Sequence, residues 1–132
     1  MTFFIFAITT IIQAFTVALG SRSINRFLAK HKSISSQRDL NAFKAIARNN
    51  MKGAAIILLV APIGILCMLH LIISYGPIWL IPIFIVNIPM YIFSTKMKAI
   101  ENKSRTLACE PHFQNEYARI GQTWLKKPWP NF

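Results

Sequence analysis

The chain contains 132 residues, of which 54% are hydrophobic, and fifteen Lys and Arg against four Asp and Glu give it a formal net charge of +11. Its polar segments are each too short to bury a core of their own, which argues against a second globular domain. In a soluble protein such a charge would suggest nucleic acid. Here the bases flank apolar segments, so anionic lipid headgroups account for them, at about 1 kcal/mol per juxtamembrane Lys or Arg, and no nucleic-acid partner is predicted.

Three segments contain no Asp, Glu, Lys or Arg: residues 2–19, 53–75 and 78–95. Each is about long enough to cross a bilayer, and each must be helical there because lipid offers the backbone no hydrogen-bond partner. The sequence therefore predicts an all-α integral membrane protein with three transmembrane helices. The predicted organisation is a transmembrane helix in 1–20, a basic segment with an amphipathic helix in 21–52, transmembrane helices in 53–75 and 78–95, and a basic tail with an aromatic end in 96–132.

The basic residues fall into two groups that indicate the orientation of the chain. Eight Lys and Arg lie in 21–52 and seven in 96–132, whereas the connection 74–77 contains none. Under the positive-inside rule both basic segments are cytoplasmic, while the N-terminus and the connection lie outside, in what we expect to be a bacterial inner membrane. No charge precedes the first apolar segment, so we expect a retained anchor rather than a cleaved signal peptide.

The second and third spans are predicted to form a tight antiparallel hairpin. Gly76 and Pro77 supply a sharp break between them, and proline suits the first turn of the following helix. Pro62 and Pro89 each remove a hydrogen bond inside a span and disturb the preceding turn. We therefore expect a kink near each of these two prolines.

The first basic segment is predicted to form a short amphipathic helix that leads into the second span. Ser36, with Asp39 three residues later, resembles a capping box, which marks the start of a helix. The predicted apolar face consists of Leu40, Phe43, Ile46 and Ala47. We expect lipid headgroups to cover this face, with a partner protein as the alternative. The bases expected to contact headgroups are Arg22, Arg26, Lys52, Lys96 and Lys98.

The tail is predicted to form a second helix outside the membrane, after the helix of the third span has continued past residue 95 and ended near Ser104. Glu110 and Pro111 open this helix, and its apolar face consists of Phe113, Tyr117, Ile120 and Trp124. Two further prolines force the last residues into an extended form. Trp129 and Phe132 would then dock on another subunit or anchor at the membrane interface, and the two possibilities remain open.

Polar side chains inside the spans are costly and therefore informative. Gln13 precedes Arg22 by nine residues and Asn87 precedes Lys96 by nine, which puts both amides about 13 Å from the same charged layer. We expect a hydrogen bond between them that joins the first and third helices, worth about 0.6 kcal/mol. The alternative is a polar pathway lined by Thr9, Gln13, Thr16 and Asn87.

A face of small residues on the first helix predicts close helix packing. Thr10, Ala14 and Ala18 are spaced by four, which lets the backbone of another helix approach.

Few residues offer catalytic or ligand chemistry. No acid lies in a span, and phosphate-loop, metalloprotease and serine-hydrolase motifs are missing. Cys67 and His70 could share a helical face, but two ligands do not complete a metal site, so His70 is a weak candidate ligand. We predict no enzyme activity, cofactor or metal. Cys67 and Cys109 lie at different levels, and we expect no disulfide between them.

These features favour a small accessory or assembly subunit that packs into a larger integral membrane protein complex. The residues predicted to pack against helices or partners are Gln13, Asn87, Thr10, Ala14, Ala18, Pro62, Pro89, Trp124, Trp129 and Phe132. One alternative is a homo-oligomeric pore, because the three spans and basic C-terminus resemble holin-like proteins in shape. A third is membrane insertion, since the layout resembles that of Oxa1-type insertases in topology, although the tight turn and the single amphipathic helix depart from it.

Overall fold

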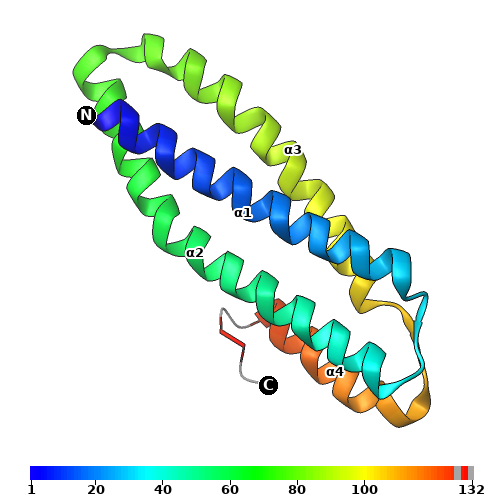
Figure 1. Ribbon diagram of the computed structural model, residues 1–132. Helices are drawn as coiled ribbons and strands as arrows, with labels where there is room; N and C mark the ends of the chain where they lie inside the picture. The colour runs from blue at the N-terminus through cyan, green and yellow to red at the C-terminus, as the bar shows by residue number, and fades with distance from the viewer. Residues whose placement is uncertain (127–128, 131–132) are drawn as a thin grey trace.

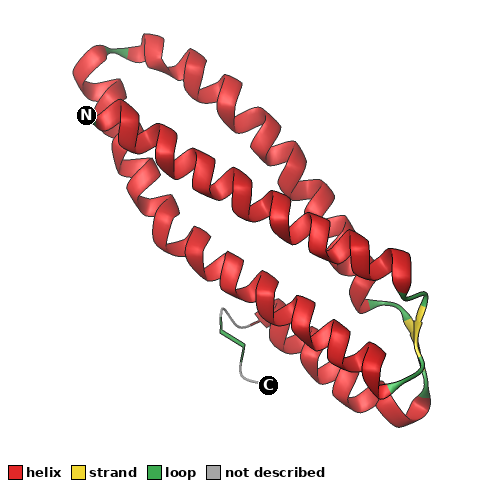
Figure 2. Cartoon of the chain, in the orientation of Figure 1, coloured by secondary structure: helices red, strands yellow, loops and turns green. Residues whose placement is uncertain are grey.

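The computed structural model describes residues 1–126, 129 and 130, and it consists almost entirely of helices (Figures 1 and 2). In chain order the elements are α1 (Thr2–Lys30), β1 (Ser33–Ile34), α2 (Gln37–Tyr75), the 3-10 helix η1 (Pro77–Trp79), α3 (Leu80–Arg105), β2 (Ala108–Cys109) and α4 (Pro111–Lys126). Within the described residues, α1, α2 and the continuous η1–α3 segment are long and apolar enough to cross a membrane. The predicted all-α fold with three such helices is confirmed.

The helix α1 lies between α2 and α3 (Figure 1). It packs along both of them, whereas α2 and α3 scarcely touch each other. The turn that joins α2 to α3 is as short as predicted, and Gly76 adopts a φ of +87°, a conformation that favours glycine. The two helices nevertheless do not pack together as the expected hairpin, because α1 occupies the space between them.

Small residues let α1 and α2 approach closely. A Cβ on Gly64 would lie 3.1 Å from Oγ1 of Thr9. A Cβ on Gly53 would lie 3.0 Å from Cγ2 of Thr16. Both threonine hydroxyls donate to carbonyl oxygens in the preceding turn of α1, at 2.8 and 2.7 Å. The face of α1 that could have lined a polar pathway therefore packs on α2, and its hydroxyls are satisfied within α1.

The hydrophobic core lies at the basic end of the molecule and is centred on Phe43 of α2, whose side chain is fully buried. The ring centroid of Phe43 lies 4.6 Å from that of Tyr117 and 5.9 Å from that of Trp124, both on α4. It lies 6.0 Å from the ring of Phe27 on α1. The other buried members of this core are Ile24, Ile34, Leu40, Ile46, Ala47, Met51 and Ile120.

The expectation about what covers the first basic segment is therefore wrong. Each segment alone is too short for a core, but their apolar faces combine, so that α4 and the end of α1 cover the start of α2. The apolar face of residues 40–47 is buried against the chain itself, and lipid headgroups do not cover it. The predicted amphipathic helix leads into the second apolar segment without a break, because α2 continues from Gln37 to Tyr75.

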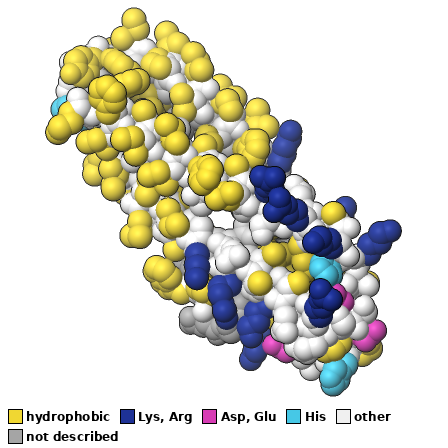
Figure 3. All heavy atoms as spheres, in the orientation of Figure 1, with side chains coloured by type: hydrophobic (Ala, Val, Ile, Leu, Met, Phe, Trp, Pro, Cys, Tyr) yellow, Lys and Arg dark blue, Asp and Glu magenta, His cyan; other side chains and the backbone are white. Residues whose placement is uncertain are grey.

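The surface divides into an apolar part and a basic part. In Figure 3 hydrophobic side chains cover one end of the molecule, and Lys and Arg gather over the other. Many large apolar side chains in the three long helices are exposed, for example Leu59 at 70% and Ile85 at 66%. Such a surface is consistent with an apolar surrounding, whereas the basic end carries an ordinary buried core.

A short strand pair and hydrogen bonds of Tyr117 hold the segments that connect the helices at the basic end. The strands β1 and β2 pair in parallel, with Ser33 opposite Ala108 and Ile34 opposite Cys109, a pairing that the sequence pattern does not reveal. The hydroxyl of Tyr117 donates to the carbonyl oxygen of Ser104 at 2.7 Å. The same hydroxyl accepts a hydrogen bond from the backbone N–H of Leu107 at 3.1 Å. These bonds fix the link between α3 and α4.

The predicted cap at the start of α2 is confirmed. The hydroxyl of Ser36 accepts a hydrogen bond from the backbone N–H of Asp39 at 3.2 Å. The Asp39 carboxylate also accepts from the backbone N–H of Ser35 and lies 2.8 Å from Nδ1 of His31. The cap thereby also connects α2 to the residue that follows α1. Cys67 and Cys109 are both free, as expected.

Replacing Phe43 tests whether the core at the basic end stabilises the fold. The Phe43→Ala variant should lose about 3–5 kcal/mol of unfolding free energy, because it leaves a cavity between three helices. The matched control is Phe84→Ala, since Phe84 is 59% exposed in the apolar part of α3. Denaturant unfolding in mild detergent, followed by circular dichroism, measures both. Equal losses for the two variants would contradict this placement of the core.

Because of Tyr117, the stability of the fold should decrease at alkaline pH. Burial raises the pKa of the Tyr117 phenol above its ordinary value. The folded chain therefore holds the phenolic proton more tightly than the unfolded chain. The resulting stability is present below the unfolded pKa of about 10 and is lost as the pH rises through the folded value. Thermal melts from pH 8 to 11 should show a steeper alkaline loss for the native chain than for Tyr117→Phe. Parallel curves would contradict this assignment.

Candidate functional site

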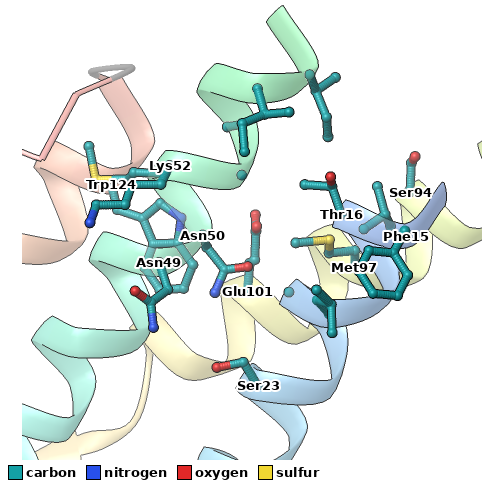
Figure 4. A pocket seen from close by; sticks show the side chains of 18 of the residues that line it. Phe15, Thr16, Ser23, Asn49, Asn50, Lys52, Ser94, Met97, Glu101 and Trp124 are labelled. Atoms are coloured by element: carbon teal, nitrogen blue, oxygen red, sulfur yellow. The ribbon is translucent and has the colours of Figure 1, made fainter. Parts of the chain in front are cut away.

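A pocket of about 760 Å³ opens where the three long helices meet the basic end (Figure 4). Its walls come from all four α-helices, and they divide by chemistry. The wall toward the apolar part carries Phe15 and Leu19 of α1 with Ile56 and Ile57 of α2. The wall toward the basic end carries Ser23, Asn49, Asn50, Lys52, Lys98 and Glu101. The pocket is thus amphipathic, with the polarity boundary of the whole molecule running through it.

Asn50 is the most unusual residue of this pocket. Its side chain is only 6% exposed, and its amide Nδ2 donates to the carbonyl oxygen of Ile46 at 2.8 Å. The other amide atom, Oδ1, is buried and has no hydrogen-bond partner within the described part of the chain. Every other buried side-chain oxygen or nitrogen among the described residues has one. An unsatisfied buried acceptor costs about 1–3 kcal/mol, so the position calls for a donor that the chain itself does not supply.

Glycine at position 20 makes room for Asn50. A Cβ on Gly20 would collide with Asn50 Oδ1 and would lie 2.7 Å from Cε of Met97 on α3. The side chains of Asn50 on α2 and Met97 on α3 therefore both lie directly against the backbone of α1 at Gly20. The packing of three helices at this level depends on the missing side chain of Gly20.

Charged groups of both signs surround the pocket. Glu101 of α3 is half-buried and points into it, as Figure 4 shows. Burial raises the pKa of the Glu101 carboxyl, and the nearby charges of Arg105 and Lys98 oppose this shift. Lys52 and Lys98 border the pocket with exposed side chains. The site therefore combines hydrogen-bond acceptors inside with cations at its edge.

The structure separates the five bases that were predicted to contact headgroups. Lys52 and Lys98 line this pocket, whereas Arg22 and Arg26 line a second hollow of about 430 Å³ beside α1. Lys96 is exposed and belongs to neither lining. Asn50 and Glu101 were not singled out from the sequence. A signal for Asn50 was present, because it continues the apolar face of Ile46, Ala47 and Met51.

A second group of interest is a polar stripe on α3, formed by Asn87, Tyr91 and Thr95 at intervals of four residues. All three side chains are exposed. Within the described residues, the hydrogen bond of the Asn87 side chain runs from Nδ2 to the carbonyl oxygen of Ile83, at 2.8 Å. One N–H and the oxygen of this amide thus face the surroundings of the apolar part.

The predicted bond between Gln13 and Asn87 is not among the hydrogen bonds of the described residues. Nε2 of Gln13 lies 3.7 Å from the position of a Cβ on Gly64, so Gln13 faces α2. The close packing of α1 on α2 turns it away from α3. The structure brings together Gln13, Thr9 and Gly64, and it leaves Asn87 on the surface.

The remaining packing candidates lie in different environments. Thr10 and Ala14 are half-buried, while Ala18, Pro62 and Pro89 are exposed. Helices α2 and α3 continue through the two prolines.

The aromatic candidates divide between the core and the surface. Trp124 is 9% exposed and packs within the chain, with the Arg105 guanidinium carbon 5.9 Å from its ring centroid. Trp129 is 60% exposed, and Phe132 lies outside the described residues.

The described residues hold no group of three His, Cys, Asp or Glu side chains that could bind a metal ion. Cys67 is buried and His70 is exposed, so the two side chains do not share one environment. No family model, curated protein or solved structure matches the chain.

Two glycine substitutions test the close approach at the pocket. Alanine has a higher helix propensity than glycine by about 1 kcal/mol, and Gly121 of α4 has room for it, since its Cβ would lie 3.8 Å from the nearest atom. Gly121→Ala should therefore raise the unfolding free energy by up to about 1 kcal/mol. Gly20→Ala should lower it by about 1–3 kcal/mol, because Asn50 and Met97 must move. Denaturant unfolding in detergent measures both, and changes of the same sign would contradict the packing at Gly20.

Proposed function

We propose that this chain is a small, non-catalytic accessory or assembly subunit of a larger integral membrane complex, and that it binds its partner through α3. The observation that carries the proposal is the exposed polar stripe of Asn87, Tyr91 and Thr95. The partner is a membrane subunit that presents hydrogen-bonding groups at the same depth.

The depth of Asn87 makes the stripe costly in lipid alone. Asn87 precedes Lys96 by nine residues, so its amide lies about 13 Å from the first charged layer of α3, near the middle of a bilayer. Nδ2 of this amide donates to Ile83, but its oxygen has no hydrogen-bond partner among the described residues, and a polar atom without a partner is costly in hydrocarbon. The hydroxyls of Thr9 and Thr16, like that of Thr95, donate to their own helix, but Thr9 and Thr16 pack on α2 whereas Asn87 is exposed. A partner helix would satisfy the amide of Asn87 and cover Tyr91.

The arrangement of the helices also supports a subunit role. Because α1 separates α2 from α3, the apolar part is an open layer whose side chains are mostly exposed, rather than a closed bundle. The buried core lies at the basic end. A layer of this kind fits a groove between larger subunits, while the basic end folds on its own core.

We further propose that the basic end is cytoplasmic, with the N-terminus and the turn at Gly76 on the opposite side, in a bacterial inner membrane. The segregation of Lys and Arg to one end supports this orientation under the positive-inside rule (Figure 3). The juxtamembrane bases then meet anionic headgroups.

A homo-oligomeric pore of the holin-like kind is the second candidate, and one observation favours it. The α3 stripe could line a lumen formed by several copies. The α1 face that contains Thr9 and Thr16 could not, because α2 covers it. In that case the partner at Asn87 would be another copy of this chain.

Photo-crosslinking in native membranes tests where the partner binds. A photoreactive residue at Tyr91 should give adducts with a larger membrane protein, because Tyr91 lies on the stripe and is 73% exposed. The matched position is Leu59 on α2, which is 70% exposed and should give fewer protein adducts. Adducts only between copies of this chain would overturn the accessory role and support the pore.

The contribution of the Asn87 amide is tested by affinity purification. Asn87→Leu should reduce the amount of co-purifying subunit by about 3- to 18-fold, the range given by intramembrane hydrogen bonds of about 0.6–1.7 kcal/mol. Ile88→Leu is the control, because it changes an exposed apolar neighbour without a hydrogen bond. A homogeneous monomer for the native chain in mild detergent, with no companion, would refute the proposal.

A further inference from the structure

We propose that the pocket around Asn50 binds one phospholipid whose headgroup donates hydrogen bonds, and that this lipid is phosphatidylethanolamine. The headgroup would lie against Asn50 and Glu101, and its acyl chains would follow the apolar wall between α1 and α2. This inference goes beyond the role as a subunit, because it assigns a ligand to a site away from the α3 stripe.

The position of the pocket fits a lipid. Its apolar wall, with Phe15, Leu19 and Ile56, belongs to charge-free segments of the chain. Its polar wall includes Lys52, which directly precedes the segment 53–75, and Lys98 and Glu101, which follow the segment 78–95 within six residues. A phospholipid changes from chain to headgroup at the same level. The volume of about 760 Å³ is also in the range of pockets that hold small ligands, about 300–1,000 Å³.

The unsatisfied acceptor of Asn50 selects the headgroup. Oδ1 is buried and has no partner among the described residues, so it calls for an N–H or O–H of the ligand. Glu101, which points into the same pocket, adds a second acceptor with a negative charge when ionised. An ethanolamine headgroup has an ammonium with three N–H donors that can serve both groups. A choline headgroup has the same phosphate but no N–H, so it would leave Asn50 unsatisfied.

The two lysines at the edge fit the phosphate. Lys52 and Lys98 border the pocket from α2 and α3. A phosphodiester beside them would gain charge-assisted hydrogen bonds. The arrangement of acceptors inside and cations at the edge therefore matches a headgroup that carries an ammonium next to a phosphate. A phosphatidylglycerol headgroup would suit the lysines and could donate from its hydroxyls, but it brings no positive charge to Glu101.

The test uses the purified full-length chain in detergent, with native mass spectrometry to count retained lipids. The probes are phosphatidylethanolamine, phosphatidylglycerol and phosphatidylcholine with identical acyl chains. The native chain should retain the ethanolamine lipid about tenfold more than the choline lipid, the ratio expected from one net hydrogen bond to a charged group. Retention of the glycerol lipid should fall between them.

Variants of the pocket assign the preference to the two acceptors. Asn50→Leu should abolish the preference for ethanolamine over choline, whereas Asn41→Leu, outside the pocket on α2, should keep it. The lipid-free stability of Asn50→Leu should equal or exceed that of the native chain, because the unsatisfied oxygen is removed. If Asn50→Leu does not fold, Glu101→Gln serves instead, and it should weaken retention of the ethanolamine lipid more than that of the glycerol lipid. Equal retention of all three lipids by the native chain would overturn the proposal, as would a first preference for the glycerol lipid. An unchanged preference in the variant that is used would overturn it as well.

Discussion

Hydrocarbon offers no hydrogen bonds, and this constraint shapes the whole molecule. In a bilayer it would require the three apolar segments to be helices, as they are, since only a helix satisfies every backbone group within one segment. It also explains why the threonines of α1 donate to carbonyl oxygens of their own helix. Against this background, an amide that is not satisfied internally stands out, because its cost needs a reason. Asn50, whose buried oxygen has no hydrogen-bond partner among the described residues, and Asn87, whose exposed amide makes one bond to its own helix, are such groups.

The molecule contains an apolar part and a basic part that are packed in different ways. In the apolar part the helices meet through small residues, such as Gly64 against Thr9, and expose most of their large side chains. In the basic end aromatic residues from three helices bury one another around Phe43. The pocket lies where the two regions meet. Its position explains why apolar, uncharged polar and charged side chains line the same cavity.

Much of the fold could be predicted because the relevant signals are local. The absence of charge in three segments marks the spans, Ser36 with Asp39 marks the start of α2, and the spacing of Tyr117, Ile120 and Trp124 marks the buried face of α4. The arrangement in space could not be predicted in the same way. Nothing in the local pattern says that α4 covers Phe43, or that α1 lies between α2 and α3. The bond between Gln13 and Asn87 was predicted only because the two residues lie at the same depth. The rotation of α1 depends instead on its close packing against glycines of α2, which turns Gln13 toward α2. Lys52 and Lys98 were expected at headgroups from their positions, but Asn50 and Glu101 become candidates only once three helices are assembled around them.

The central claim is that three helices cross the bilayer and that both basic segments lie on one side. Cysteine accessibility in intact cells tests it most directly, in a background that carries Cys67→Ala and Cys109→Ser. A membrane-impermeant thiol reagent should label Ser74→Cys, near the turn after α2, without permeabilisation. It should label Gln114→Cys, on the exposed face of α4, only after the membrane is opened. Labelling of both positions from the same side would contradict the account.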